Sequence, residues 1–324
     1  MLVLDEQDIR AALDERDCIA AVERALAAHE RGETCGPVAT GFPLPGGSVH
    51  AKAAGIRHYG RTFVVVKANV NLPDNPRHGR PTIQGALLLL DGDDGHPLAV
   101  MDSIPITSMR TAAVAALAAR YLALPEADTI TIVGCGEQGE SQLRAMATIR
   151  DLRRAFVLDR DVAKAAAFAE RLSKALPLAI EPTTDLSAAV RASEICVTCT
   201  TSQSPIIGRG HLHAGLFIAA VGADNPSKQE IHPDAMAASV VVVDSLAGCA
   251  AGGDLHHALV SGAMTESGVH GELSAIVSGR VPARTTADQT IIFDSTGSAL
   301  QDVAAALVVY EHATASDRLQ RGLR

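Results

Sequence analysis

The chain has 324 residues, 47% of them hydrophobic and 20% charged, which is ordinary for a globular protein and long enough for about two domains. Lysine and arginine total 28 against 37 aspartates and glutamates, and the formal charge of −9 argues against a nucleic-acid or anionic-membrane partner. No apolar run approaches the ~20 residues that span a bilayer, and the N-terminus lacks the pattern of a signal peptide, so we expect a cytoplasmic protein.

The N-terminal part mixes helical and strand patterns. Apolar residues at helical spacing predict helix over 5–30, and the run 32–47, rich in glycine and proline, predicts a loop with a short strand. Further elements are expected in chain order: a strand at 62–67, a loop at 73–81, a hairpin of 84–90 with 97–101, and an alanine-rich helix at 107–122.

From Thr129 the pattern changes to alternating strands and helices, which indicates a parallel sheet with helices on both faces. Strands are expected near 129–133, 154–158, 194–200, 216–221, 239–243 and 290–293. A last helix over 300–313 should pack back on the first domain. We therefore predict an α/β protein with an N-terminal α/β domain, a Rossmann-type doubly wound parallel sheet and a C-terminal helix.

The glycine motif Gly134-Cys-Gly-Glu-Gln-Gly139 stands between the first of these strands and a helix. Its glycines allow a tight turn at Gly134, the approach of a pyrophosphate at Gly136, and close helix packing at Gly139. Asp159 follows Gly134 at close to the ~20-residue spacing of the carboxylate that binds a ribose and repels a 2′-phosphate, and Arg160 softens that repulsion. The motif predicts NAD binding with NADP tolerated. A glycine-rich turn of another α/β protein, such as a methyltransferase, is the alternative.

The cysteines and histidines form no metal pattern. Cys196 and Cys199 are three apart in a strand pattern, where they face opposite sides, so we expect buried free thiols. The two close pairs of histidines, near residues 212 and 256, lack both the H-E-x-x-H spacing and a cluster of carboxylates. We expect no catalytic metal.

Three charged residues stand where a site is plausible. Lys67 ends the expected strand 62–67, and its spacing alone favours a surface lysine over one that points into a site. Arg110 lies near the start of a predicted helix, where a cation opposes the helix dipole, so it predicts an anionic partner such as a substrate carboxylate. Asp224 follows the expected strand 216–221, at the edge where ligands bind in open α/β sheets, and is either a site residue or a turn residue.

Segments over nearly the whole chain resemble, in the same order, motifs of the ornithine cyclodeaminase/μ-crystallin family. They are Lys67-Ala-Asn, Asn75-Pro with Pro81-Thr-Ile-Gln-Gly85, Thr107-Ser-Met-Arg-Thr-Ala-Ala113, the glycine motif, Val221-Gly-Ala-Asp-Asn-Pro226, Glu272-Leu, and Phe293-Asp-Ser-Thr-Gly297 with Gln301-Asp-Val. The resemblance implies a homodimer of two-domain chains. A discontinuous α/β substrate-binding and dimerisation domain would comprise 1–121, completed by the C-terminal helix 297–324, and 122–296 would be the NAD-binding Rossmann domain.

The resemblance also implies NAD(P) as cofactor, 2-amino or 2-imino acids as substrates, and roles for single residues. Lys67 and Arg110 would hold the substrate α-carboxylate, Lys67 would also move a proton at the imine nitrogen, and Asp224 would be an acid/base. Beside the glycine motif, Asp159 and Arg160, cofactor contacts are expected at Thr111, Gln138, Thr198, Thr200, Val221 and Ser295.

Two departures from the family bear on the substrate. Where many relatives carry an arginine that binds the α-carboxylate, the stretch 36–40 has no cation, and Lys52 stands where relatives carry a Met-Pro-Ala run. Lys52 either replaces that arginine, faces a second substrate carboxylate, or is a solvated lysine. It would repel the distal ammonium of ornithine by about 4 kcal/mol at about 4 Å.

We therefore expect a reductase of a 2-imino acid, or the reverse amino-acid dehydrogenase, on a small or dicarboxylic substrate such as iminosuccinate. An ornithine or lysine cyclodeaminase, which is an ammonia lyase, is one alternative. A non-catalytic NAD(P)-dependent crystallin-like binding protein is the other.

Overall fold

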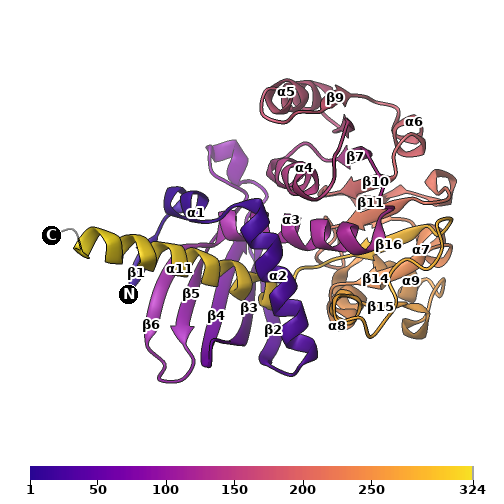
Figure 1. Ribbon diagram of the computed structural model, residues 1–324. Coiled ribbons are helices and arrows are strands. Elements are labelled where there is room, and N and C mark those ends of the chain that lie inside the picture. Colours follow the sequence, from indigo (N-terminus) through magenta and orange to yellow (C-terminus); the bar gives the residue numbers. More distant parts are fainter. Residues whose placement is uncertain (323–324) are drawn as a thin grey trace. The chain divides into compact units, whose positions relative to one another are not determined.

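The computed structural model describes residues 1–322, which form two compact units whose elements are drawn in Figure 1. The first unit consists of Met1–Arg110 with the chain from Ser298 onward, and the second is Thr111–Gly297. The division lies inside helix α3, Ser103–Leu122, and not near residue 121, where the sequence analysis put it. Helix α3 therefore supplies residues to both units.

A six-stranded sheet forms the first unit, in the order β1-β6-β5-β4-β3-β2. In that order the strands are Leu2–Leu4, Pro97–Asp102, Ile83–Asp91, Arg61–Asn71, Gly47–His58 and Thr34–Leu44. Strands β1 and β6 run parallel and the other neighbours antiparallel. The predicted hairpin is confirmed as the pair β5–β6. A short 3-10 helix, η1 at Asn75–His78, lies within the predicted loop.

Helices α2, Glu15–Glu30, and α11, Ala299–Gly322, lie across one face of this sheet (Figure 1). The stretch predicted as helix over 5–30 is two helices. Helix α1, Glu6–Ala12, ends at Leu13, and Asp14 caps α2 by accepting a hydrogen bond from the backbone N–H of Asp17 at 2.7 Å. The last helix packs on the first unit, as predicted.

The loop with a short strand predicted at 32–47 is wrong in its proportions, because most of this run is the 11-residue strand β2. This strand is the edge of the sheet and most of its side chains are exposed, so it lacks the apolar alternation that reveals a strand. Glycine and proline, which argued for a loop, are tolerated at an edge because no neighbouring strand needs their N–H groups.

Strand β4 alternates between the two faces of the sheet. Phe63, Val65 and Lys67 are 7%, 0% and 3% exposed and share one face, whereas Val66 between them is 41% exposed. Helix α11 contacts β4 and β3. Because the strand continues to Asn71, Lys67 lies in its middle and points to the buried side, so it is not the surface lysine that its spacing favoured.

The second unit is built on an eight-stranded parallel sheet in the order β15-β14-β16-β12-β10-β7-β8-β9. In that order the strands are Gly271–Glu272, Val240–Val243, Ile291–Asp294, Phe217–Ala220, Ile195–Thr198, Thr129–Val133, Arg154–Leu158 and Ala179–Pro182. The six strands predicted here are confirmed. Their sequences could be recognised because most of their side chains are buried, so the strands read as apolar runs. The two at the edges, β15 and β9, are short and were missed.

The chain winds in opposite directions from β7, toward β8 and β9 on one side and β10 and β12 on the other, so the doubly wound Rossmann-type fold is confirmed. A small parallel pair, β11 and β13, lies beside it. The remaining elements are β11 Gln203–Ile207, β13 Gln229–Ile231, α4 Glu137–Ile149, α5 Val162–Ser173, α6 Leu186–Arg191, η2 Arg209–His211, α7 Pro233–Ala237, α8 Leu246–Gly252, α9 Asp254–Val260, η3 Glu266–Gly268 and α10 Leu273–Val277.

The six cysteines are free thiols. Cys196 is buried and Cys199 is partly exposed. Within residues 1–322 no helix combines the length and the apolar character needed to cross a membrane. In the same residues no three histidine, cysteine or carboxylate side chains gather as a metal site.

Candidate active site

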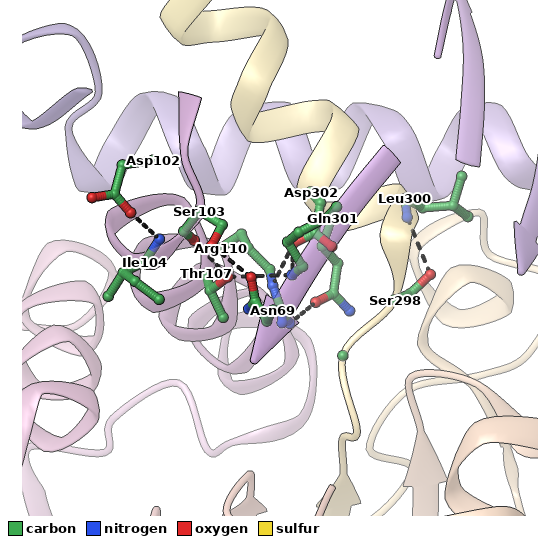
Figure 2. A network of polar contacts seen from close by, with 12 residues as sticks. Asn69, Asp102, Ser103, Ile104, Thr107, Arg110, Ser298, Leu300, Gln301 and Asp302 are labelled. Atoms are coloured by element: carbon green, nitrogen blue, oxygen red, sulfur yellow. Dashed lines mark hydrogen bonds and ion pairs between the residues drawn. The ribbon is translucent and has the colours of Figure 1, made fainter. Parts of the chain in front are cut away.

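A buried ion cluster joins β4, α3 and α11 within the first unit, and Figure 2 shows its polar network. The Nζ atom of Lys67 lies 2.7 Å from Oδ1 of Asp302, and Nε of Arg110 lies 2.9 Å from the same oxygen. The three residues are 3%, 0% and 5% exposed in the order Lys67, Asp302, Arg110. One carboxylate oxygen thus binds two cations away from water, where an ion pair is screened little.

Hydrogen bonds around the cluster fix its orientation. Nη1 of Arg110 donates to Oε1 of Gln301 at 2.8 Å (Figure 2). The hydroxyl of Thr107 donates to the backbone oxygen of Ser103 at 2.7 Å, so its lone pairs are left to accept from Lys67 Nζ at 3.2 Å. Ser103 in turn donates to Oδ1 of Asn69 at 2.6 Å.

The surroundings of Lys67 shift its proton affinity. Burial lowers the pKa of Lys67 to about 7; the attraction of Asp302 opposes this, and repulsion by Arg110 and Lys52 adds to it. Burial disfavours the ionised form of Asp302, but the attraction of Lys67 and Arg110 outweighs it and the pKa of Asp302 is lowered. Lys67 can therefore exchange a proton near neutral pH, while Asp302 stays charged.

Lys52 belongs to the surroundings of this cluster. On β3 it stands directly opposite Lys67 of β4, and directly opposed residues of neighbouring strands share a face of the sheet. Its charge acts on both Lys67 and Asp302, and its side chain is partly buried. Lys52, Lys67 and Arg110 together leave an excess of positive charge around the Asp302 carboxylate. This charge favours the interpretation that Lys52 faces an anionic ligand over the interpretation that it is a solvated lysine.

Arg110 does not lie at the start of its helix, so the predicted opposition to the helix dipole is wrong. Helix α3 begins at Ser103, several residues before the predicted start, so Arg110 lies beyond the first turn, where the helix dipole has little effect. Its anionic partner in the structure is Asp302, from the other end of the chain. The Gln301-Asp-Val motif contained this residue, but nothing in its local sequence signals that it pairs with two buried cations.

In the second unit, the three positions of the glycine motif require a glycine for different reasons. A Cβ on Gly134, whose φ is +111°, would lie 2.8 Å from the backbone oxygen of Cys199, and one on Gly139 would lie 2.0 Å from that of Gly134. A Cβ on Gly136 would meet Nζ of Lys164 at 3.9 Å, an ordinary contact. The fold itself requires Gly134 and Gly139, whereas Gly136 leaves space beside the first turn of α4.

Asp159 lies directly after β8, beside the glycine motif. Its Oδ2 accepts from the N–H of Cys135 at 2.9 Å and lies 3.2 Å from Nζ of Lys164, and its Oδ1 accepts from the N–H of Asp161 at 3.1 Å. Burial opposes its ionisation, but these backbone hydrogen bonds and Lys164 outweigh burial and lower the pKa of Asp159. Arg160 beside it is exposed.

These residues fit a dinucleotide. The free space at Gly136, an ionised carboxylate at the end of the next strand and the N-terminus of α4 are the features that bind a pyrophosphate and a ribose. In addition, the buried Oε1 of Gln138 has no hydrogen-bond partner within residues 1–322, so a donor is missing beside the motif.

Buried carboxylates, which the sequence analysis did not single out, shape the loops at the same edge of this sheet. Glu230 accepts from the hydroxyl of Thr198 at 2.8 Å and from the N–H groups of Thr200 at 2.6 Å and Gly222 at 2.8 Å. Asp244 accepts from the hydroxyl of Ser295 and the N–H of Gly297, both at 2.8 Å. The hydroxyls of Thr198 and Ser295 are thus used to hold the loops after β10 and β16.

Two further acids extend this set. Asp254 accepts from the N–H of Glu230 at 2.8 Å, and Asp294 accepts from the N–H of Leu255 at 2.8 Å. Burial raises the pKa of Glu230 to about 7 and that of Asp254 to about 6, and burial with repulsion from Asp254 raises the pKa of Asp294 well above its usual range. Gly222 and Gly253 leave room for these groups, since a Cβ on either would come within 2.5 Å of a carboxyl atom.

The other predicted site residues lie in the second unit. Asp224 is in the loop after β12 with its side chain 47% exposed, and its Oδ1 lies 2.8 Å from Nζ of Lys228 and accepts from Nδ2 of Asn225 at 2.9 Å. Val221 donates its N–H to the backbone oxygen of Thr198 at 2.9 Å, and Thr111, the first residue of the unit, is buried. The structure joins Lys67 and Arg110 directly through Asp302, whereas Asp224 belongs to the other unit.

Comparisons with known proteins agree with this fold along the whole chain. The model of the ornithine cyclodeaminase/mu-crystallin family matches residues 1–317. The structure of a Delta(1)-pyrroline-2-carboxylate reductase from Thermococcus litoralis, in complex with NADH and L-proline, has a TM-score of 0.94 and 29% identity and covers 98% of each chain.

Two more structures cover 98% of this chain and 97% of theirs. An archaeal alanine dehydrogenase dimer with bound NAD has a TM-score of 0.92 and 29% identity. The iminosuccinate reductase of Paracoccus denitrificans, in complex with NAD⁺, has a TM-score of 0.88 and 28% identity. The methyltransferase alternative is thereby excluded, and the chain belongs to the ornithine cyclodeaminase/mu-crystallin family.

Proposed function

We propose that the protein is an NAD(H)-dependent reductase that converts a 2-imino acid to the L-amino acid, or runs the reverse dehydrogenase reaction. It is an oxidoreductase acting on CH–NH₂ or C=N groups, as its relatives are, and its cofactor is NAD. The observation that carries the proposal is the buried cluster of Lys67, Arg110 and Asp302, which combines anion binding with a lysine that titrates near neutrality.

The proposed chemistry divides the work between the two cations. Arg110 and Lys67 would orient the substrate α-carboxylate, which fixes the position of the imine carbon. When bound, NADH supplies the hydride to that carbon. Protonated Lys67 would give a proton to the imine nitrogen and become a neutral amine, which solvent then reprotonates. Asp224, through a water, is the second candidate for this proton transfer.

The charge around Asp302 supports a small or dicarboxylic substrate such as iminosuccinate. Lys52, Lys67 and Arg110 leave positive charge that a second carboxylate would neutralise. The distal ammonium of ornithine or lysine would instead meet like charge, which disfavours a cyclodeaminase. The lowered pKa of Lys67 favours a role in proton transfer over a purely binding role.

Oxidation of NADH tests the proposal, measured with ammonia plus oxaloacetate, pyruvate or glyoxylate. We expect turnover with at least one of these 2-oxo acids, which form 2-imino acids with ammonia. Ornithine and lysine serve as the comparison: ammonia release from either without net change in NADH would contradict the reductase and support the cyclodeaminase. Absence of turnover on every substrate would favour the binding protein.

Lys52→Glu is expected to weaken dicarboxylic substrates by about 5- to 150-fold in kcat/KM, the ~1–3 kcal/mol of a charge-assisted hydrogen bond. Small neutral side chains should be nearly unaffected. Lys174→Glu, which reverses the charge of an exposed lysine of the second unit, is the control. It should change kcat/KM neither for dicarboxylic substrates nor for those with small neutral side chains. Equal damage to all substrates would mean that Lys52 binds the α-carboxylate instead.

Gly136→Val is expected to abolish NADH binding in a folded protein. The free protein has room for a Cβ at this position, whereas a branched side chain would occupy the space that the pyrophosphate needs. Fluorescence titration with NADH measures the loss, and circular dichroism checks the fold. Gly210→Val, at a glycine with no atoms near its missing Cβ, is the control. Unchanged NADH affinity in folded Gly136→Val would remove the motif from the cofactor site.

A homodimer is part of the proposal. Val38, Ala53, Val66 and Leu88 are successive partners across β2, β3, β4 and β5, so they share the face opposite to that of Lys67. Val38 and Val66 are 62% and 41% exposed, and Phe42 on the same face is 58% exposed. An apolar sheet face of this kind is typical of a protein–protein contact, and a single-chain mass in light scattering would contradict the dimer.

A further inference from the structure

The end of the cofactor site that would hold the adenosine ribose carries a cation that the glycine motif does not require. Lys164, in the first turn of α5, folds back so that its Nζ lies 3.2 Å from Oδ2 of Asp159. The same Nζ lies 3.9 Å from the position of a Cβ on Gly136. It therefore stands over the space between the glycine loop and the carboxylate.

This arrangement changes what Asp159 can do. A carboxylate selects NAD over NADP when it is free to accept both ribose hydroxyls and when its charge is unopposed. Here its two oxygens already accept backbone N–H groups, from Cys135 and Asp161, and one of them faces the Lys164 ammonium. With exposed Arg160 beside it, the formal charge of the three side chains is positive, so a 2′-phosphate meets attraction that Asp159 alone would not give.

We propose that Lys164 is a specificity-determining residue that lets this enzyme bind NADPH as well as NADH, by leaving Asp159 and pairing with the 2′-phosphate. The side chain of Lys164 is 50% exposed and flexible, so its ammonium can turn to the phosphate without entering a dry interior. With NADH the lysine keeps its pair with Asp159, whose carboxylate still faces the ribose. The inference rests on the cofactor site of the proposed function.

Fluorescence titration of the full-length protein with NADH and with NADPH tests the inference without any knowledge of the substrate. We expect the wild type to bind the two cofactors with dissociation constants within about tenfold of each other. In Lys164→Ala, NADPH affinity should fall by at least about tenfold, the scale of one charge-assisted contact, while NADH affinity changes less than about threefold. NADPH binding by the wild type should also weaken more steeply with added salt, because an exposed charge pair is screened.

Lys174→Ala is the matched control, since it removes an exposed lysine that directly follows α5 and pairs with Glu170. Its affinities for both cofactors should equal those of the wild type. The inference is overturned if Lys164→Ala weakens both cofactors alike or neither, or if the wild type prefers NADH by more than about 100-fold, a preference of about 2.7 kcal/mol. If the wild type binds neither cofactor, both the inference and the proposed function are wrong. If the wild type binds NADH normally and only the results for Lys164→Ala differ from the expectation, the inference alone is wrong.

Discussion

Replacing Asp302 by asparagine is expected to destabilise the protein by about 3–5 kcal/mol, the cost of leaving a buried charge without its partner. The carboxylate is 0% exposed and binds both Lys67 and Arg110. An asparagine keeps the shape and one acceptor oxygen but removes the charge that holds two cations away from water. Urea unfolding of the variant and the wild type measures the difference in the free energy of unfolding.

The loss should depend on pH in a defined direction. The pKa of Lys67 is about 7 in the folded protein, below its ordinary value of 10.5, so above pH 7 the folded wild type already holds Lys67 neutral. The variant, without Asp302, holds it neutral at lower pH as well. The contribution of the Lys67–Asp302 attraction is therefore present below pH 7 and lost as the pH rises through 7. We expect a larger destabilisation at pH 6 than at pH 9.

Asp74→Asn is the control for this experiment. Asp74 belongs to the same unit and pairs with Arg77, but both side chains are highly exposed, so the change should have little effect on stability. If Asp302→Asn unfolds no more readily than Asp74→Asn, the buried cluster does not balance charge as the geometry indicates.

Lys67→Met is expected to lower kcat by about 10²- to 10⁴-fold, the usual contribution of a positioned general acid. Methionine keeps the unbranched shape and most of the length of the side chain without a titratable group, and Asp302 retains its pair with Arg110. In the wild type, the reductive rate should fall as the pH rises through about 7, because protonated Lys67 is the donor, and the reverse oxidation should rise over the same range. Stopped-flow or steady-state profiles of kcat against pH measure both limbs.

Lys67→Arg separates proton transfer from binding. Arginine keeps the positive charge but does not give up its proton near neutrality, so KM should change less than kcat, and the pH-dependent limb at about 7 should disappear. A retained limb in either variant would assign the proton transfer to another group, with Asp224 the first to test.

The parts of the fold that could be predicted are those whose signal is local. The buried parallel strands read as apolar runs, and the glycine motif is bounded by a strand and a helix, so both were found. Strand β2 was missed because an exposed edge strand needs no apolar alternation. The spacing of Lys67 alone favours a surface residue, because its buried partner Asp302 lies 235 residues away in the chain and leaves no local signal.

In the candidate site, too, the residues with a local sequence signal could be predicted and the others could not. Lys67, Arg110 and the glycines stood out through motifs, but their partners did not. Asp302, Glu230 and Lys164 have functions only through tertiary neighbours, and a carboxylate in a short local stretch carries no sign of whether it will be buried. Arg110 pairs with an anion of the protein itself, Asp302, but the predicted reason for an anion there is wrong, because α3 starts earlier and Arg110 lies beyond its first turn.

The buried acids Glu230, Asp254 and Asp294 have a calorimetric consequence. The formal charge of −9 counts every carboxylate as ionised, but the pKa values of Glu230, about 7, and Asp254, about 6, mean that the folded chain still carries some of these protons near pH 6. In an unfolded chain the two carboxyls would have their ordinary pKa values of 4.5 and 3.8 and would release these protons. These groups thus add a proton release to thermal unfolding at pH 6, so the measured heat should vary with the ionisation enthalpy of the buffer. Their contribution to stability decreases as the pH rises from 5 to 7.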